Sequence, residues 1–201
     1  MGQFRYFVRM FDRIADVPGD VVECGLGQGL TFAMLAYLAG SEGRVPLRTL
    51  RGFDSFQGFP EPTEQDQSSR NPKRGEWSID GSVVRMRLQE SGIFKAFPEL
   101  PIRITPGFFE DTLPKEGGYG IAFLHLDVDI YPSYRDCLRY LFPMVAPGGV
   151  VLFDEYKWYS VKKSEEEIWP GATKAIDEYL DPRGYKPEYY PEMKKYFVIK
   201  R

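Results

Sequence analysis

Two aspartates, Asp127 and Asp129, directly follow the apolar run IAFLHL, and two further acids, Asp154 and Glu155, follow the apolar run VVLF. A carboxylate just beyond a buried strand costs free energy unless something nearby holds it. If the two runs are neighbouring parallel strands, about 4.8 Å apart, Asp127, Asp154 and Glu155 converge at the carboxyl end of the sheet. Like charges about 4 Å apart repel by about 4 kcal/mol at an effective dielectric of 20, so such a cluster either takes up protons or binds a cation.

The ion that suits this cluster is a hard one. All-oxygen ligands favour Mg²⁺ first, with Ca²⁺ or Mn²⁺ as alternatives. A zinc site is not expected, because His125 is the only histidine and Cys24 and Cys137 lack metal-ligand spacing. His125 itself lies inside the apolar run, where a hydrogen-bonded core histidine is more frequent than a catalytic one.

A second group of residues forms a glycine turn. VVECGLGQGLT places Gly25, Gly27 and Gly29 between an expected strand and an expected helix. Glycines there let the backbone approach a ligand, and the helix N-terminus offers unpaired N–H groups to an anion; a plain tight turn is the alternative. The dinucleotide fingerprint G-x-G-x-x-G would need glycine where Leu30 stands. The next expected strand ends in Asp54, which is suited to hold a ribose diol or is an ordinary cap or loop acid.

The elements that must position these residues follow from short apolar runs that alternate with helical patterns. We expect strands at 21–24, 50–53, 102–105, 121–126 and 150–153, and helices at 30–38, 134–145 and 171–180. This alternation predicts an α/β domain with a doubly wound, mostly parallel sheet covered on both faces. The tail YKPEYYPEMKKYFVIK predicts an antiparallel hairpin at the end of the sheet, and 201 residues predict a single domain.

Three other segments carry weaker predictions. Apolar residues recur at helical spacing near the start, so residues 1–18 are expected to form a helix that packs on the sheet or on a partner subunit rather than on a membrane. Residues 60–80 are polar and aperiodic, which is typical of a mobile lid or of a disordered loop. The acidic run 164–167 is expected to begin a helix.

Composition excludes several classes of protein. The net charge of −3 gives no basic footprint for nucleic acid. The N-terminus lacks a signal-peptide pattern, and no apolar run reaches the about 18 residues of a membrane span. Two free thiols fit a reducing compartment. We therefore expect a cytoplasmic protein with no nucleic-acid or membrane partner.

The pattern acid-x-Gly-x-Gly-x-Gly, followed by an acid that ends the second strand, resembles the S-adenosylmethionine-dependent methyltransferases. The resemblance implies a seven-stranded sheet with an antiparallel seventh strand. It implies the methionine moiety near the glycine turn with Thr31 close to its carboxylate, the ribose at the end of the second strand, and the adenine near GFFEDTLP. The cofactor-binding residues implied in this way are Glu23, Gly25, Gly27, Gly29, Thr31, Asp54, Ser55, Phe109, Glu110 and Asp127.

A narrower resemblance comes from LHLDVDIYPSYRDCLRYLFPMVAPGGVVLFDEY, which is similar to the core of the macrocin-type (TylF/MycF/NovP) sugar O-methyltransferases. VVECGLGQG, FDSFQGFPEP, GFFEDTLP and PGATKAIDEYL resemble the other blocks of that family, so the resemblance runs from about residue 20 to 180. It implies Asp127, Asp154 and Glu155 as ligands of a divalent cation and Asp129 as the general base. The implied acceptor is a hydroxyl of a sugar or another vicinal diol.

One departure from the family concerns the N-terminus. About 20 residues precede the glycine turn, whereas family members usually carry a longer extension that helps to cover the acceptor and to form the subunit interface. A homo-oligomer is therefore an open expectation, as is the identity of the acceptor.

Three alternatives stay open at this point. A catechol-type methyltransferase shares the same layout. A nicotinamide oxidoreductase is disfavoured by Leu30 and by the acid cluster. A non-catalytic cofactor-binding domain would predict a damaged acid set, yet all four acids are present.

Overall fold

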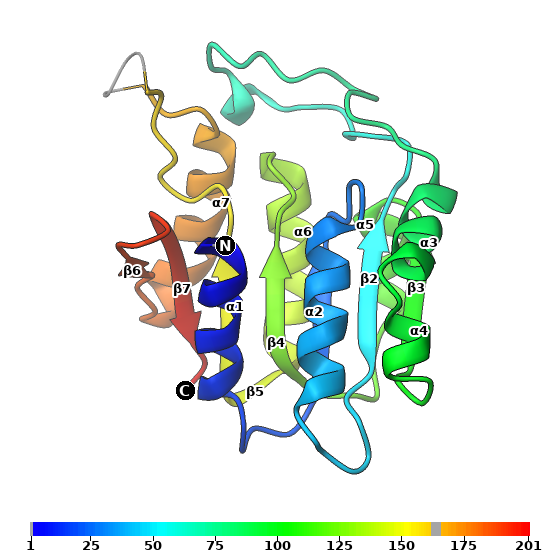
Figure 1. Cartoon of the computed structure of the whole chain (residues 1–201). Helices are drawn as coiled ribbons and strands as arrows, with labels where there is room; N and C mark the ends of the chain where they lie inside the picture. Colours follow the sequence, from blue (N-terminus) through cyan, green and yellow to red (C-terminus); the bar gives the residue numbers. More distant parts are fainter. Residues whose placement is uncertain (1, 162–165) are drawn as a thin grey trace.

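The computed structural model describes residues 2–161 and 166–201. Within these ranges seven strands form one sheet in the order β3-β2-β1-β4-β5-β7-β6 (Figure 1). Their bounds are β1 Asp20–Cys24, β2 Leu50–Asp54, β3 Ile102–Pro106, β4 Ile121–Leu126, β5 Val145–Phe153, β6 Glu188–Tyr190 and β7 Lys195–Ile199. The first five strands pair in parallel, and β7 pairs antiparallel with both β5 and β6. The predicted parallel sheet with a C-terminal hairpin is confirmed.

Helices cover both faces of the sheet. Their bounds are α1 Gly2–Arg13, α2 Leu30–Ser41, α3 Gly81–Glu90, α4 Ile93–Ala96, α5 Phe109–Thr112, α6 Tyr131–Leu141 and α7 Pro170–Leu180. Helices α1 and α2 pack in front of the sheet in Figure 1 and α6 and α7 behind it, and each layer has its own apolar cluster. Strand β4 supplies both clusters, with Ala122 and Phe123 in the front one and Ile121, Leu124 and Leu126 in the rear one, and all six of its residues are buried. No helix in the described ranges combines the length and the apolarity needed to cross a membrane.

One buried cation fastens the front layer to the sheet. The Arg48 guanidinium donates to the carbonyl oxygens of Ile14, Val17 and Gly19 at 2.6–2.8 Å and forms an ion pair with Glu42. A buried guanidinium is tolerated only when its donors are satisfied, as they are here. Arg48 holds the connection from α1 into β1 at three carbonyls, and the Arg44 guanidinium donates to a fourth, that of Ala15.

Several element boundaries differ from the sequence prediction. Helix α6 begins at Tyr131 rather than at residue 134, because Pro132 suits a first helical turn, and it ends at Leu141. Strand β5 begins at Val145 rather than at residue 150: Val145 pairs with Ile121, and the ladder is irregular before Val150. The run Pro147-Gly148-Gly149, which follows the expected helix at 134–145, therefore lies within strand β5 as an irregularity. Helix α1 spans residues 2–13 of the predicted 1–18, of which residue 1 lies outside the described ranges.

The polar segment 60–80 crosses the carboxyl end of the sheet, along the top of Figure 1. It is packed rather than structureless: buried Asp66 accepts hydrogen bonds from the backbone N–H groups of Thr63 and Tyr131, and the Ser68 hydroxyl donates to the Ile168 carbonyl. Its role as a mobile lid stays a prediction. Of the expected helix start at 164–167, residues 164 and 165 lie outside the described ranges, and Glu167 forms a β-bridge with Tyr159.

Candidate active site

Backbone hydrogen bonds join the ends of the four central strands at one edge of the sheet. The N–H of Gly25 donates to the Phe53 carbonyl at 2.9 Å, and the N–H of Asp127 donates to the Cys24 carbonyl at 3.0 Å. A Cβ on Gly25, whose φ is 84°, would lie 1.8 Å from the Asp127 carbonyl oxygen, so only glycine fits this close approach. The glycine turn and the first pair of acids are thus in direct backbone contact.

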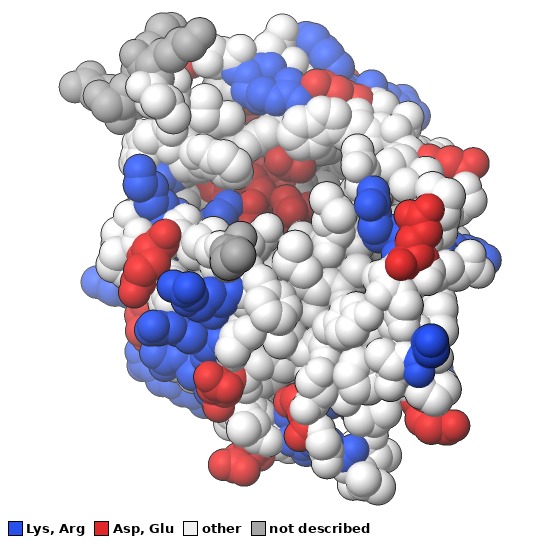
Figure 2. Space-filling view, in the orientation of Figure 1, with Lys and Arg blue, Asp and Glu red and all other residues white. Residues whose placement is uncertain are grey.

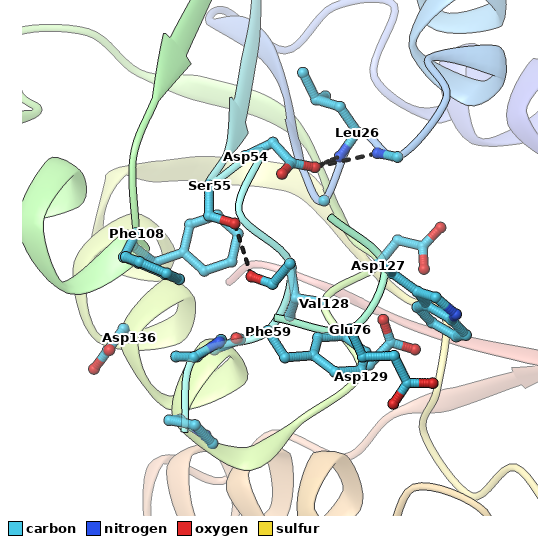
Figure 3. Close-up of a pocket in the computed structure, with 18 of the residues that line it drawn as sticks. Leu26, Asp54, Ser55, Phe59, Glu76, Phe108, Asp127, Val128, Asp129 and Asp136 are labelled. Atoms are coloured by element: carbon cyan, nitrogen blue, oxygen red, sulfur yellow. Dashed lines mark hydrogen bonds between the residues drawn. The ribbon is translucent and has the colours of Figure 1, made fainter. Parts of the chain in front are cut away.

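A cavity of about 400 Å³ opens at this edge (Figure 3). Of the residues predicted to bind a cofactor, those that line it are Gly25, Gly27, Thr31, Asp54, Ser55, Phe109, Glu110 and Asp127. Glu23 and Gly29 lie outside the lining. Glu23 is fully buried within β1, and Gly29 precedes α2, where it packs closely against Val84.

Asp54 lines the cavity and also fastens the glycine turn. Its Oδ2 accepts the N–H groups of Leu26 at 2.7 Å and Gly27 at 3.1 Å, as drawn in Figure 3, and its Oδ1 accepts the N–H of Phe56 at 2.7 Å. These bonds are the ones expected if Asp54 is an ordinary loop acid, which was the alternative to ribose binding. A carboxylate has about four lone-pair sites, so one remains for a ligand in the cavity.

The four acids meet as expected, but in two overlapping groups. Carboxylate oxygens of Asp127, Asp129 and Glu155 lie within 4.8 Å of one another, and a second group with the same spread joins Asp127 and Asp154 to a ring nitrogen of His125. Figure 2 shows red side chains at the bottom of a recess on this face. The predicted ligand set of Asp127, Asp154 and Glu155 is therefore divided between two groups that share Asp127.

The first group favours the protonated form of its acids. Burial, with the charge of Asp154 added, raises the pKa of Asp127 to about 6. Burial and the neighbouring acids hold the pKa values of Asp129 and Glu155 well above their ordinary values. Among the described residues, no lysine, arginine or histidine forms an ion pair with Asp129 or Glu155.

Asp154, by contrast, has cationic partners. The Lys195 ammonium contacts its Oδ2, and the Nε2 of His125 lies 3.7 Å from its Oδ1. Burial alone would raise the pKa of Asp154, but His125 and Lys195 outweigh it and hold the pKa below its ordinary value. Asp154 is thus held ionised beside three acids whose pKa values are raised.

His125 connects the site to the interior of the sheet. Its Nδ1 lies 2.9 Å from the Glu23 Oε1, so the expected hydrogen-bonded core histidine is present. Burial alone would lower the pKa of His125, but Asp154 and Glu23 raise it to about 10. Its contact with the acids could have been predicted, because His125 and Asp127 are two residues apart and so share one face of the strand.

The backbone at Asp129 is strained. Its φ is 61°, and the N–H of Ile130 donates to the Val128 carbonyl at 2.7 Å, which closes a three-residue turn around Asp129. Such a conformation persists only where surrounding structure holds it, here through the Asp129 N–H, which donates to Glu155 at 3.3 Å. Glu155 is fixed in turn by the Tyr134 hydroxyl at 2.6 Å.

Sequence reasoning gave residues 60–80 as a lid or a disordered loop, but it did not name the side chains that this segment and α6 place in the cavity lining. Phe59, Glu76 and Trp77 line the cavity opposite the glycine turn, and Ser133 and Asp136 line it from α6. An aperiodic segment carries no pattern that predicts its path across the sheet. The one available signal was a tryptophan in an otherwise polar stretch.

The sheet order, the glycine turn and the acids beside it define the class of Rossmann-like methyltransferase domains. Residues 3–180 match the family model Macrocin-O-methyltransferase (TylF), which is most of the chain. The chain belongs to this family, and the resemblance that its sequence motifs carry is confirmed.

Individual relatives agree with this assignment. The chain is 30% identical over 177 residues to mycinamicin III 3''-O-methyltransferase of Micromonospora griseorubida, covering 86% of this chain and 64% of that one. It is 31% identical over 145 residues to 8-demethyl-8-(2,3-dimethoxy-alpha-L-rhamnosyl)-tetracenomycin-C 4'-O-methyltransferase of Streptomyces olivaceus, covering 70% and 54%. The solved structure of the O-methyltransferase NovP superposes with a TM-score of 0.78 at 25% identity, over 99% of this chain and 79% of that one. The chain thus spans only 54% and 64% of the lengths of these two curated relatives.

Proposed function

We propose that this protein transfers a methyl group from S-adenosylmethionine to a hydroxyl of a sugar or another vicinal diol, with the help of a divalent cation. The observation that carries the proposal is the convergence of Asp127, Asp129 and Glu155 beside a cavity that the glycine turn also lines. The names of the two curated relatives, which are O-methyltransferases of glycosylated metabolites, support the acceptor class.

The cavity fits the proposed methyl donor. Its volume of about 400 Å³ lies in the range of small-molecule sites. A Cβ on Gly27 would meet nothing within 4 Å, so the turn leaves space for a ligand against the backbone. Thr31 is then available to the carboxylate of the donor, Asp54 and Ser55 to its ribose, and Phe109 and Glu110 to its adenine. The donor supplies the sulfonium methyl group.

The acids fit a divalent cation. Three converging carboxylates, buried or partly buried and without ammonium or guanidinium ion-pair partners among the described residues, favour a bound ion over mutual repulsion. Asp127, Asp154 and Glu155 are the proposed ligands, with Mg²⁺ as the first candidate. The Lys195 ammonium contacts Oδ2 of Asp154, so Oδ1, which lies 3.7 Å from the Nε2 of His125, is the oxygen left for a cation.

The chain's own residues then accept the proton of the acceptor and align the reacting groups. A cation at the site supplies the positive charge that lowers the pKa of an acceptor hydroxyl. Without a cation the raised pKa of Asp129 favours its protonated form. The charge of a bound cation would favour the ionised form, which can accept the hydroxyl proton. The strained turn at Asp129 fixes the direction of its carboxylate, and the cavity residues align the acceptor oxygen with the methyl group.

Calorimetry with S-adenosylmethionine, with and without Mg²⁺, tests binding of the donor. A methyl-transfer screen on diol-bearing sugars and on catechols, run in Mg²⁺ and in chelator, then tests the reaction. We expect donor binding in both conditions and Mg²⁺-dependent transfer to sugars. Equal transfer in chelator would remove the cation from the proposal, and transfer to catechols alone would move the acceptor to that class.

A further inference from the structure

Trp77 lies in the cavity lining, yet 58% of its surface is exposed. It shares the cavity with Asp129, the proposed base. A large exposed aromatic side chain beside a site gains little free energy from folding, because most of its apolar surface stays in water. Its presence therefore needs another explanation.

The backbone of Trp77 strengthens this point. Its φ is 63°, in the left-handed region that a bulky L-residue rarely adopts. Backbone conformations of this kind are unfavourable and cluster at ligand sites, where the surrounding structure maintains them. Trp77 is therefore both strained and exposed, a combination that stability alone does not explain.

The surrounding structure holds the indole in place. The N–H of Phe59 donates to the Glu76 carbonyl at 3.1 Å, and the N–H of Gly75 donates to the Phe59 carbonyl at 2.9 Å, so two strand-like bonds fix the backbone just before Trp77. The rings of Phe59 and Trp169 lie 5.2 Å and 5.9 Å from the Trp77 ring, centroid to centroid. The indole is thus ordered before any ligand binds, which lowers the entropic cost of binding.

Polar groups lie near the ring, and a guanidinium lies over one of its faces, which leaves the other face for a ligand. The Arg70 guanidinium lies 4.7 Å from the Trp77 ring centroid and forms an ion pair with Glu76, which also lines the cavity. A pyranose is complementary to this arrangement, because it has an apolar C–H face and hydroxyls around its edge. C–H groups pack favourably on the electron-rich face of an indole, while a carboxylate and a guanidinium bind hydroxyls.

We propose that Trp77 is the platform on which the sugar ring of the acceptor stacks, with Glu76 and Arg70 as partners for its hydroxyls. This inference rests on the proposed function and adds to it the residue that recognises a carbohydrate ring. In this inference the segment 60–80, which crosses the sheet, recognises the acceptor, and the glycine turn binds the donor.

The test measures sugar binding without turnover. Methyl α-L-rhamnopyranoside is titrated, in Mg²⁺ and S-adenosylhomocysteine, into the wild-type chain, Trp77→Ala, Trp77→Phe and the control Phe94→Ala, which removes a 49% exposed aromatic ring on α4 outside the cavity. We expect Trp77→Ala to weaken sugar binding about tenfold, which corresponds to about 1.4 kcal/mol. Trp77→Phe should keep most of the affinity, and Phe94→Ala should match the wild type.

Other outcomes separate this inference from the proposed function. Unchanged sugar affinity in Trp77→Ala, or no sugar binding by the wild type, overturns the inference. A loss of S-adenosylhomocysteine affinity in Trp77→Ala overturns it as well, because Trp77 would then belong to the donor site. Trp77-dependent sugar binding in a chain that transfers no methyl group would instead support the inference and contradict the proposed reaction.

Discussion

Neutralising Asp127 should stabilise the metal-free protein at neutral pH. The folded chain raises the pKa of Asp127 from 3.8 to about 6 through burial and the charge of Asp154. Because the folded-state pKa is above the unfolded one, the unfolded chain binds fewer protons between pH 4 and 6, and the free energy of unfolding falls as the pH rises through that window. One pKa unit corresponds to about 1.4 kcal/mol, so the ionised side chain costs the fold at most about 3 kcal/mol above pH 6.

Urea unfolding of the wild type and of Asp127→Asn, in chelator, measures this cost. At pH 7.5 we expect the variant to be the more stable by up to about 3 kcal/mol, and we expect the difference to vanish near pH 4. Asp12→Asn, which removes an equal charge from an exposed position on α1, serves as the control and should show no such dependence. Adding Mg²⁺ at pH 7.5 should stabilise the wild type more than the Asp127 variant, since a ligand stabilises the state that binds it.

Two results would refute this reasoning. One is a variant less stable than the wild type at pH 7.5 in chelator, which would mean that Asp127 is held by favourable contacts rather than opposed by its surroundings. The other is a stability difference that persists unchanged to pH 4, because it would not follow the ionisation of Asp127.

Three further substitutions test other parts of the molecule. Asp129→Asn keeps a residue type that tolerates the left-handed turn, so we expect an intact fold and intact Mg²⁺ stabilisation with turnover lowered about 10²- to 10⁴-fold; unchanged turnover would exclude Asp129 as the base. Arg48→Ala leaves Glu42 and three carbonyls unpaired and should lower the free energy of unfolding by about 3–5 kcal/mol in urea titrations, whereas a loss below about 1 kcal/mol would show that water replaces the guanidinium. Asp54→Asn converts an acceptor of three backbone N–H groups into a weaker one and should lower S-adenosylmethionine affinity about tenfold in calorimetry, with equal affinity contradicting a role for Asp54 in the turn.

The sequence was sufficient for the features that depend on local pattern. The apolar runs that end in Asp127 and Asp154 predicted neighbouring parallel strands, and β4 and β5 are neighbours. The glycine spacing predicted a tight turn between strand and helix, and Gly25, Gly27 and Gly29 all have positive φ between β1 and α2. Both predictions work because strand periodicity and glycine stereochemistry are properties of a few adjacent residues.

Features that depend on distant contacts were not predicted. Lys195, 41 residues beyond Asp154, reaches it from β7, and no local pattern indicates that pairing. The early start of β5 at Val145 depends on its partner Ile121, which overrides the Pro-Gly-Gly signal for a turn. The path of Trp77 over the site follows from two bonds to Phe59, across a segment without periodicity.

The contact between Gly25 and the Asp127 carbonyl has a consequence for how such a protein can diversify. The donor side and the acid side share one rigid main-chain unit, so the spacing between them cannot be adjusted one residue at a time without a steric clash. The 55–80 segment is hydrogen-bonded through Asp66 to Tyr131 and through Ser68 to Ile168, and it carries its own side chains into the cavity. In the proposed methyl transfer, new acceptor preferences can therefore arise by exchange of the side chains of this segment, while the residues proposed for the chemical step stay the same.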